Sequence, residues 1–171
     1  MPESVWLMPL KDLDDDARAI KLGEVAGIEV AAGQRRFVGD PLRMMLVGLE
    51  EESRHPFAID ADGAAVGVMT LQTGAATLAG WADDDSVLLL RGFLIDHRQQ
   101  GRGLGTLAAE AAVWAAAKLV AALGGGEEGV VLSVNDENPA ARVVYRRAGF
   151  RDHGQYLGGA SGPQRTLYRA F

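Results

Sequence analysis

The feature that most constrains the fold is a junction at residues 87–105, which read VLLLRGFLIDHRQQGRGLG. A run from Val87 to Ile95, apolar except for Arg91, is followed by a short polar link, three glycines at alternate positions and a long alanine-rich stretch. Continuous apolar runs are typical of a central strand that is buried on both faces. Glycines between a strand and a helix allow left-handed torsions, so successive N–H groups can surround an anion. The sequence therefore predicts a strand, an anion-binding turn and a helix, in this order.

Three nucleotide-binding motifs compete for these glycines. A Walker loop requires a lysine after its last glycine, and none is present here. The dinucleotide fingerprint G-x-G-x-x-[GA] is met at 103–108, but an acidic residue about 20 positions later should close the next strand. The next candidate strand, at 129–134, comes later than that. The third pattern, Q-x-x-G-x-G, is met at 100–105, and an overlapping R-x-x-G-x-G is met at 98–103.

A second motif lies at residues 135–150, which read NDENPAARVVYRRAGF. It contains N-x-x-A-x-x-x-Y-x-x-x-G-F, met by Asn138, Ala141, Tyr145, Gly149 and Phe150. With Q-x-x-G-x-G preceding it in the same chain, the pair resembles the two signatures of the GNAT superfamily of N-acetyltransferases, which bind acetyl-CoA. The resemblance covers roughly residues 56–171 and, more loosely, the N-terminal part.

The resemblance implies an α/β (α+β) fold. We expect a single mixed, mostly antiparallel twisted sheet of six to seven strands with about four helices and splayed central strands. A chain of 171 residues suits one compact domain, so residues 1–171 are expected to form a single N-acetyltransferase domain.

The hydrophobic pattern predicts where these elements lie. Strands are expected at 5–10, 57–59, 65–71, 87–95, 129–134, 150–156 and 164–171. Helices are expected after the acids at 12–16, from Asp40 to Leu49, from Leu104 to the glycines at 124–126, and from Asn138 to Gly149. Residues 60–63 are expected to form a hairpin turn, and residues 72–85 a loop.

The resemblance also implies that backbone groups bind acetyl-CoA. Those of Phe93, Leu94 and Ile95 would pair with the pantetheine arm, and the N–H of Leu94 would stabilise the oxyanion. The pyrophosphate would lie on the glycine turn, at the positive end of the following helix. The turn residues assigned to it are Gln100, Gly101, Arg102, Gly103, Leu104, Gly105 and Thr106. Arg98 and Arg102 would add positive charge, although either can equally be a solvated surface arginine.

Tyr145 is the candidate general acid. A phenol with a pKa of about 10 stays protonated at neutral pH and can protonate a departing thiolate. Asn138 would either bond the pantetheine or cap the helix, and Ala141 and Tyr145 belong to the same cofactor-binding segment. The general base is left open. A water chain could serve, and the candidate side chains are Glu50, Asp83, Asp84, Asp85, Asp96 and His97.

Composition bears on other functions. The chain has no cysteine, which excludes disulfides and thiolate sites, and its three histidines lack metal-ligand spacing, so we expect no metal. A net charge of −6 disfavours nucleic-acid binding and favours cationic substrates. No stretch of about 20 apolar residues is free of charges, so no membrane span is expected. The first residues lack the basic region of a secretory signal, and we expect a cytoplasmic protein. A homodimer is compatible with these features.

We therefore expect an N-acetyltransferase that moves the acetyl group of acetyl-CoA to a primary amine by direct attack in a ternary complex. The segment LLLRGFLID followed by QGRGLG most resembles the branch that acetylates polyamines and other small amines. Acceptor residues would lie in the first two helices and in residues 72–85. Aminoglycoside and protein N-terminal acetyltransferases are alternatives, as are a non-catalytic acyl-CoA-binding sensor, which would not need Tyr145, and a nicotinamide-binding enzyme.

Overall fold

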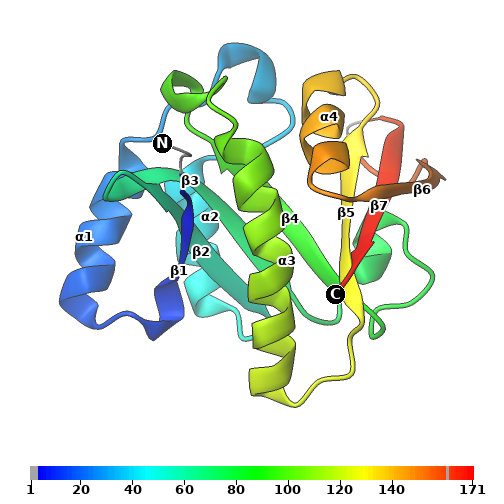
Figure 1. Ribbon diagram of the computed structural model, residues 1–171, viewed down its shortest axis with the longest axis horizontal. Helices are drawn as coiled ribbons and strands as arrows, with labels where there is room; N and C mark the ends of the chain where they lie inside the picture. Colours follow the sequence, from blue (N-terminus) through cyan, green and yellow to red (C-terminus); the bar gives the residue numbers. More distant parts are fainter. Residues whose placement is uncertain (1–3, 161) are drawn as a thin grey trace. The chain divides into compact units, whose positions relative to one another are not determined.

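The computed structural model describes residues 4–160 and 162–171. Over these residues the strands are β1 (Trp6–Pro9), β2 (Arg54–Ala61), β3 (Ala64–Gln72), β4 (Leu88–Ile95), β5 (Gly129–Asn135), β6 (Arg151–Tyr156) and β7 (Gln164–Ala170). The α-helices are α1 (Asp15–Ala26), α2 (Pro41–Glu50), α3 (Leu104–Leu123) and α4 (Pro139–Arg147), as labelled in Figure 1. The chain forms two compact units: Met1–Thr70 with Gly92–Ala108, and Leu71–Arg91 with Ala109–Phe171.

The strands follow the sheet order β1-β2-β3-β4-β5-β7-β6. The pairs β1/β2, β5/β7 and β6/β7 are antiparallel, whereas β4 and β5 are parallel, with Leu88 opposite Val130 and Leu89 opposite Val131. The predicted mixed, mostly antiparallel α/β fold is confirmed, with its seven strands and four α-helices in the described part of the chain. The splaying of the central strands and the single domain stay predictions.

In the first unit, a tight hairpin joins β2 to β3 through Asp62 and Gly63. Their φ angles are 52° and 83°, and positive φ at both positions of a two-residue loop is the mark of a type I′ turn. The predicted turn is thus confirmed in place, but it is shorter than the range 60–63. Asp60 belongs to β2 because it pairs with Trp6 of β1, which extends the ladder to the edge of the turn.

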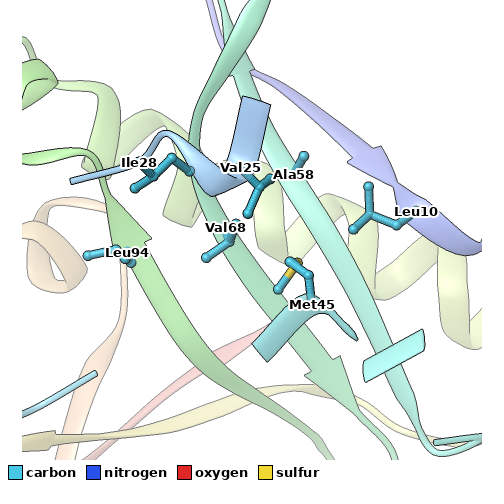
Figure 2. Packing of buried hydrophobic residues seen from close by; sticks show 7 residues of the cluster. All are labelled: Leu10, Val25, Ile28, Met45, Ala58, Val68 and Leu94. Carbon is cyan, nitrogen blue, oxygen red and sulfur yellow. The ribbon is translucent and has the colours of Figure 1, made fainter. Parts of the chain in front are cut away.

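The helices of the first unit begin as the sequence predicts. Asp14 accepts a hydrogen bond from the Ala17 N–H at 2.8 Å, and Asp40 accepts one from the Arg43 N–H at 2.8 Å. Between these helices and the strands lies an apolar cluster, shown in Figure 2. Its buried members are Leu10, Val25, Ile28, Met45, Ala58, Val68 and Leu94. Leu94 thus anchors the end of β4 in this core.

In the second unit, β7 pairs with β5 from Gly129↔Ala170 to Asn135↔Gln164. The segment predicted as a plain loop, 72–85, contains a 3₁₀ turn at Ala76–Ala79 and packs on β7. The Thr166 hydroxyl donates to the Ala79 carbonyl at 2.6 Å, and the Trp81 ring stacks on Tyr168 with centroids 4.7 Å apart. This segment is therefore held by specific contacts.

Of the described helices, α3 has the length and composition of a possible membrane span, with a mean hydropathy of 1.5. This is weak evidence, because a core helix of a soluble protein passes the same test. The helix carries Glu110 and Lys118, and Ala109, Ala112 and Ala116 on it are fully buried within the protein.

Candidate active site

The last half of β4 bends at a glycine. Gly92 has a φ of 60°, which takes the backbone out of the extended region in mid-strand. Beyond it, Leu94 and Ile95 are buried, and the Asp96 N–H donates to the Val66 carbonyl of β3 at 2.7 Å. A Cβ at Gly67 would collide with the Leu94 carbonyl, so β3 and β4 approach closely there. With their side chains in the core, Leu94 and Ile95 can offer a ligand only main-chain groups.

The glycine turn follows a 3₁₀ turn at His97–Gln99 and opens α3. Gly101 and Gly103 have φ angles of 81° and 78°, and a Cβ built on either meets no atom within 4 Å. The Leu107 N–H donates to the Gly103 carbonyl at 3.3 Å, which closes the first helical turn. The N–H groups of residues 104–106 come before it and have no acceptor within an α-helix. An exposed turn with open space beside its glycines, at a helix N-terminus, has the features of an anion site.

The two arginines of the turn are both ion-paired. Arg98 binds the buried carboxylate of Asp96, with Nη2 2.7 Å from Oδ2. Arg102 binds the exposed Asp62 at the β2–β3 hairpin, with Nη2 2.9 Å from Oδ2. The Arg98 guanidinium hydrogen-bonds to Asp96 and thereby holds the pKa of that carboxyl below its ordinary value. Direct phosphate binding by either arginine stays a prediction.

The second signature folds as a capped helix in the second unit. The Asn138 side chain accepts a hydrogen bond from the Ala141 N–H at 3.3 Å, so the capping role of Asn138 is present. Gly149, with a φ of 90°, ends α4, and the Phe150 N–H returns to the Tyr145 carbonyl at 3.0 Å. The spacing of this motif thus follows from the start and the end of one short helix.

Tyr145 is buried, with 8% of its surface exposed, and its ring contacts Phe150 edge-on with centroids 5.8 Å apart. Burial raises the pKa of the phenol above its ordinary value of 10.0, because the charged phenolate would be desolvated. The side chain is therefore kept in the protonated form, which is the form that a general acid requires.

Hydrogen bonds narrow the choice of general base. The Ser86 hydroxyl and backbone lower the pKa of Asp83, the Thr77 N–H lowers that of Asp84, and Arg98 lowers that of Asp96. A carboxylate with a lowered pKa is a weaker proton acceptor. Three other candidates from the sequence, Glu50, Asp85 and His97, are exposed and remain candidates for the general base.

The structure adds contacts that sequence reasoning missed. Arg98 also donates to the Gly27 carbonyl at 2.8 Å, and the Gln100 side chain donates to the Gln34 side chain at 3.0 Å. No sequence pattern indicates Gly27, because the group that accepts the hydrogen bond from Arg98 is a backbone carbonyl, which every residue has. For metals, residues 4–160 and 162–171 contain no group of three histidine, aspartate or glutamate side chains arranged to hold an ion.

Comparison with known proteins decides the family. A profile of the "Acetyltransferase (GNAT) family" matches residues 21–150, most of the chain. The chain belongs to the GNAT family. The "Uncharacterized N-acetyltransferase YbbJ" of Bacillus subtilis (strain 168) is 26% identical to this GNAT protein over 147 residues, covering 86% of this chain and 89% of YbbJ.

Solved GNAT structures share the fold at low identity. Aminoglycoside acetyltransferase AAC(6')-Ib in complex with coenzyme A and kanamycin has a TM-score of 0.66 at 18% identity, covering 98% of this chain and 94% of its own. Spermidine N-acetyltransferase from Vibrio cholerae in complex with CoA and spermine has a TM-score of 0.65 at 14% identity, covering 98% and 95%. This GNAT protein is an acetyl-CoA-dependent N-acetyltransferase.

Proposed function

We propose that this GNAT protein transfers the acetyl group of acetyl-CoA directly to the primary amine of a small cationic acceptor such as a polyamine. The main observation in support of acetyl-CoA binding is the glycine turn, where Gly101 and Gly103 adopt positive φ at the start of α3. Such a turn presents N–H groups to a pyrophosphate without a Cβ in the way.

In this proposal the main chain binds the cofactor. The pyrophosphate lies on N–H groups of the turn, from Gln100 to Thr106, and Arg102 adds charge. Backbone groups of Phe93, Leu94 and Ile95 pair with the pantetheine arm. Asn138 and Ala141 begin the helix that carries Tyr145, and Asn138 keeps an amide N–H₂ for the pantetheine while its oxygen caps α4.

The reaction is one displacement. The neutral amine attacks the thioester carbon, and the N–H of Leu94 stabilises the negative oxygen that forms. The C–S bond then breaks, the thiolate takes the phenolic proton of Tyr145, and the amine loses a proton to a base or to water. Burial keeps Tyr145 protonated for this step, which supports its assignment as the acid.

The acceptor is inferred from charge. The protein carries a net charge of −6, and acids are grouped at 50–52 and 83–85. An ammonium group is attracted to such a surface over several ångströms of solvent. A structural neighbour binds spermine and another binds kanamycin, so both acceptor types belong in a test. We also propose that the enzyme is cytoplasmic and that it needs no metal.

Steady-state assays with a panel of amines test the proposal. The panel contains spermidine, spermine, kanamycin, a peptide with a free N-terminus and an anionic amine. We expect the highest kcat/KM with a polyamine. Turnover of kanamycin or the peptide alone would identify that compound as the acceptor in place of a polyamine, and the proposed acetyl transfer would stand. Binding of acetyl-CoA without turnover of any amine would indicate the non-catalytic sensor.

A further inference from the structure

We propose that Arg98 is a positioning residue: it fixes the start of the glycine turn to the segment that follows α1, instead of binding phosphate itself. The inference rests on the proposed function, in which the turn holds the pyrophosphate of acetyl-CoA. It gives a different role to a side chain that the sequence motif assigns to the cofactor.

The first contact is a fork on Asp96. The Arg98 Nε donates to Oδ1 at 3.1 Å and Nη2 donates to Oδ2 at 2.7 Å, while the Arg98 backbone N–H donates to Oδ1 at 2.9 Å. Asp96 is only 3% exposed. A buried carboxylate requires a charged, hydrogen-bonded partner, and the planar guanidinium provides both donors at once. The fork therefore commits one edge of Arg98 to Asp96.

The second contact reaches across 71 residues of sequence to the end of α1. The Arg98 Nη2 donates to the Gly27 carbonyl at 2.8 Å, and Nη1 lies 3.6 Å from Oε1 of Glu29. The adjacent His97 N–H donates to the Glu29 carbonyl at 2.8 Å. A cation is well placed here, because the carbonyls at a helix C-terminus carry partial negative charge. All three guanidinium nitrogens thus lie near protein acceptors.

The Gln100 side chain also bonds both to the end of β4 and to the segment that follows α1. Its Nε2 donates to the Ile95 carbonyl at 3.1 Å and to the Gln34 side chain at 3.0 Å. The side chains of Arg98 and Gln100 therefore bond to residues 27–34, and the anion is left to the backbone N–H groups of the turn. Since the N–H directions of the turn depend on how its first residues are held, Arg98 controls the shape of the anion site without touching the anion.

Binding of two ligands to Arg98→Lys separates the two roles. Lysine is an adequate phosphate binder but cannot form the fork. Acetyl-CoA carries the phosphates, and acetyl-pantetheine lacks them. For a positioning residue, Arg98→Lys lowers acetyl-CoA affinity fivefold or more in calorimetry and raises its KM, because the fork is lost although the charge remains. Acetyl-pantetheine does not reach the anion site, so its affinity and KM should stay unchanged. Arg35→Lys, at an exposed arginine that follows Gln34 in sequence, should change neither. Retained acetyl-CoA affinity in Arg98→Lys would overturn the inference.

A second variant keeps the test decisive if the buried charge complicates folding. Asp96→Asn removes the carboxylate that accepts the fork but keeps the charge of Arg98, and circular dichroism reports whether the fold is kept. Lowered acetyl-CoA affinity in Asp96→Asn supports positioning, and unchanged or tighter acetyl-CoA binding identifies Arg98 as a phosphate ligand. A merely structural role lowers kcat through the folded fraction and leaves KM unchanged, which also refutes the inference. Absence of acetyl-CoA binding by the unmodified protein is the separate result that would reject the proposed function.

Discussion

At the scale of single residues, Tyr145 makes the most direct prediction. Tyr145→Phe removes the proton donor but keeps the ring and its contact with Phe150. We expect kcat to fall by about 10²-fold, which is typical for the loss of a general acid, with little change in acetyl-CoA affinity. Rapid-quench assays measure the chemical step directly. An unchanged rate of that step would remove Tyr145 from the mechanism.

The burial of Tyr145 also predicts the pH profile. The protonated phenol is the active form, and its pKa is raised above 10.0, so deprotonation occurs at higher pH than for an exposed tyrosine. kcat should therefore show no alkaline decline up to about pH 10, the ordinary pKa of tyrosine. A descending limb in kcat near pH 8, under conditions where the protein stays folded, contradicts this assignment of the acid.

Gly103 tests the turn itself. Gly103→Val places a β-branched side chain at a φ of 78°, which costs about 1–2 kcal/mol in the left-handed region. The added Cβ meets no protein atom within 4 Å, so the fold should survive. The N–H groups of the turn would be misdirected, and the side chain would occupy the space of the anion. Titration should show acetyl-CoA affinity lowered by at least tenfold. Gly126→Val is the control, because Gly126 is exposed, has no positive φ and is equally open. Normal acetyl-CoA binding by Gly103→Val would count against the turn.

At the scale of elements, the sequence is most informative where local chemistry decides the structure. Capping acids and proline predict the start of α2, and Asp62-Gly63 predicts the hairpin, because both depend on neighbours within four residues. The segment 72–85 could not be assigned in this way. Its 3₁₀ turn is held by Thr166, which lies 87 residues from Ala79 in sequence, and no local pattern encodes such a contact.

Gly80 shows how tightly this segment is held. Its φ is 83°, and a Cβ there would lie 2.7 Å from the Thr166 hydroxyl and 2.8 Å from the Tyr156 ring. Gly74 has a similar φ of 65° but nothing within 4 Å. Gly74→Ala should therefore lower the free energy of unfolding by about 1–2 kcal/mol, the left-handed cost alone. Gly80→Ala adds overpacking, for a total of about 2–5 kcal/mol. Urea unfolding measures both, and equal losses would mean that the packing at Gly80 relaxes freely.

At the scale of the whole molecule, the two signatures and their order were enough to predict the family and the sheet. They could not predict the partners of the arginines. Arg98 is satisfied by a buried carboxylate and a helix-end carbonyl, and Arg102 by the hairpin residue Asp62. The contacts of Arg98 with Gly27 and of Arg102 with Asp62 span 71 and 40 residues and depend on tertiary structure. A motif therefore indicates which residue types lie near a ligand but not which of them touch it.

The net charge of −6 predicts how the KM for the acceptor depends on salt. If ammonium acceptors are drawn to the acidic surface, their KM should rise as salt shortens the Debye length from about 10 Å at 0.1 M to about 3 Å at 1 M. Glu52→Gln and Asp85→Asn remove exposed charges, so each should raise the KM for spermidine modestly at low salt and not at high salt. Assays at low and high salt with spermidine and an anionic amine provide the comparison. A spermidine KM that is indifferent to salt, or a preference for the anionic amine, would reject the cationic acceptor while the acetyl transfer remains.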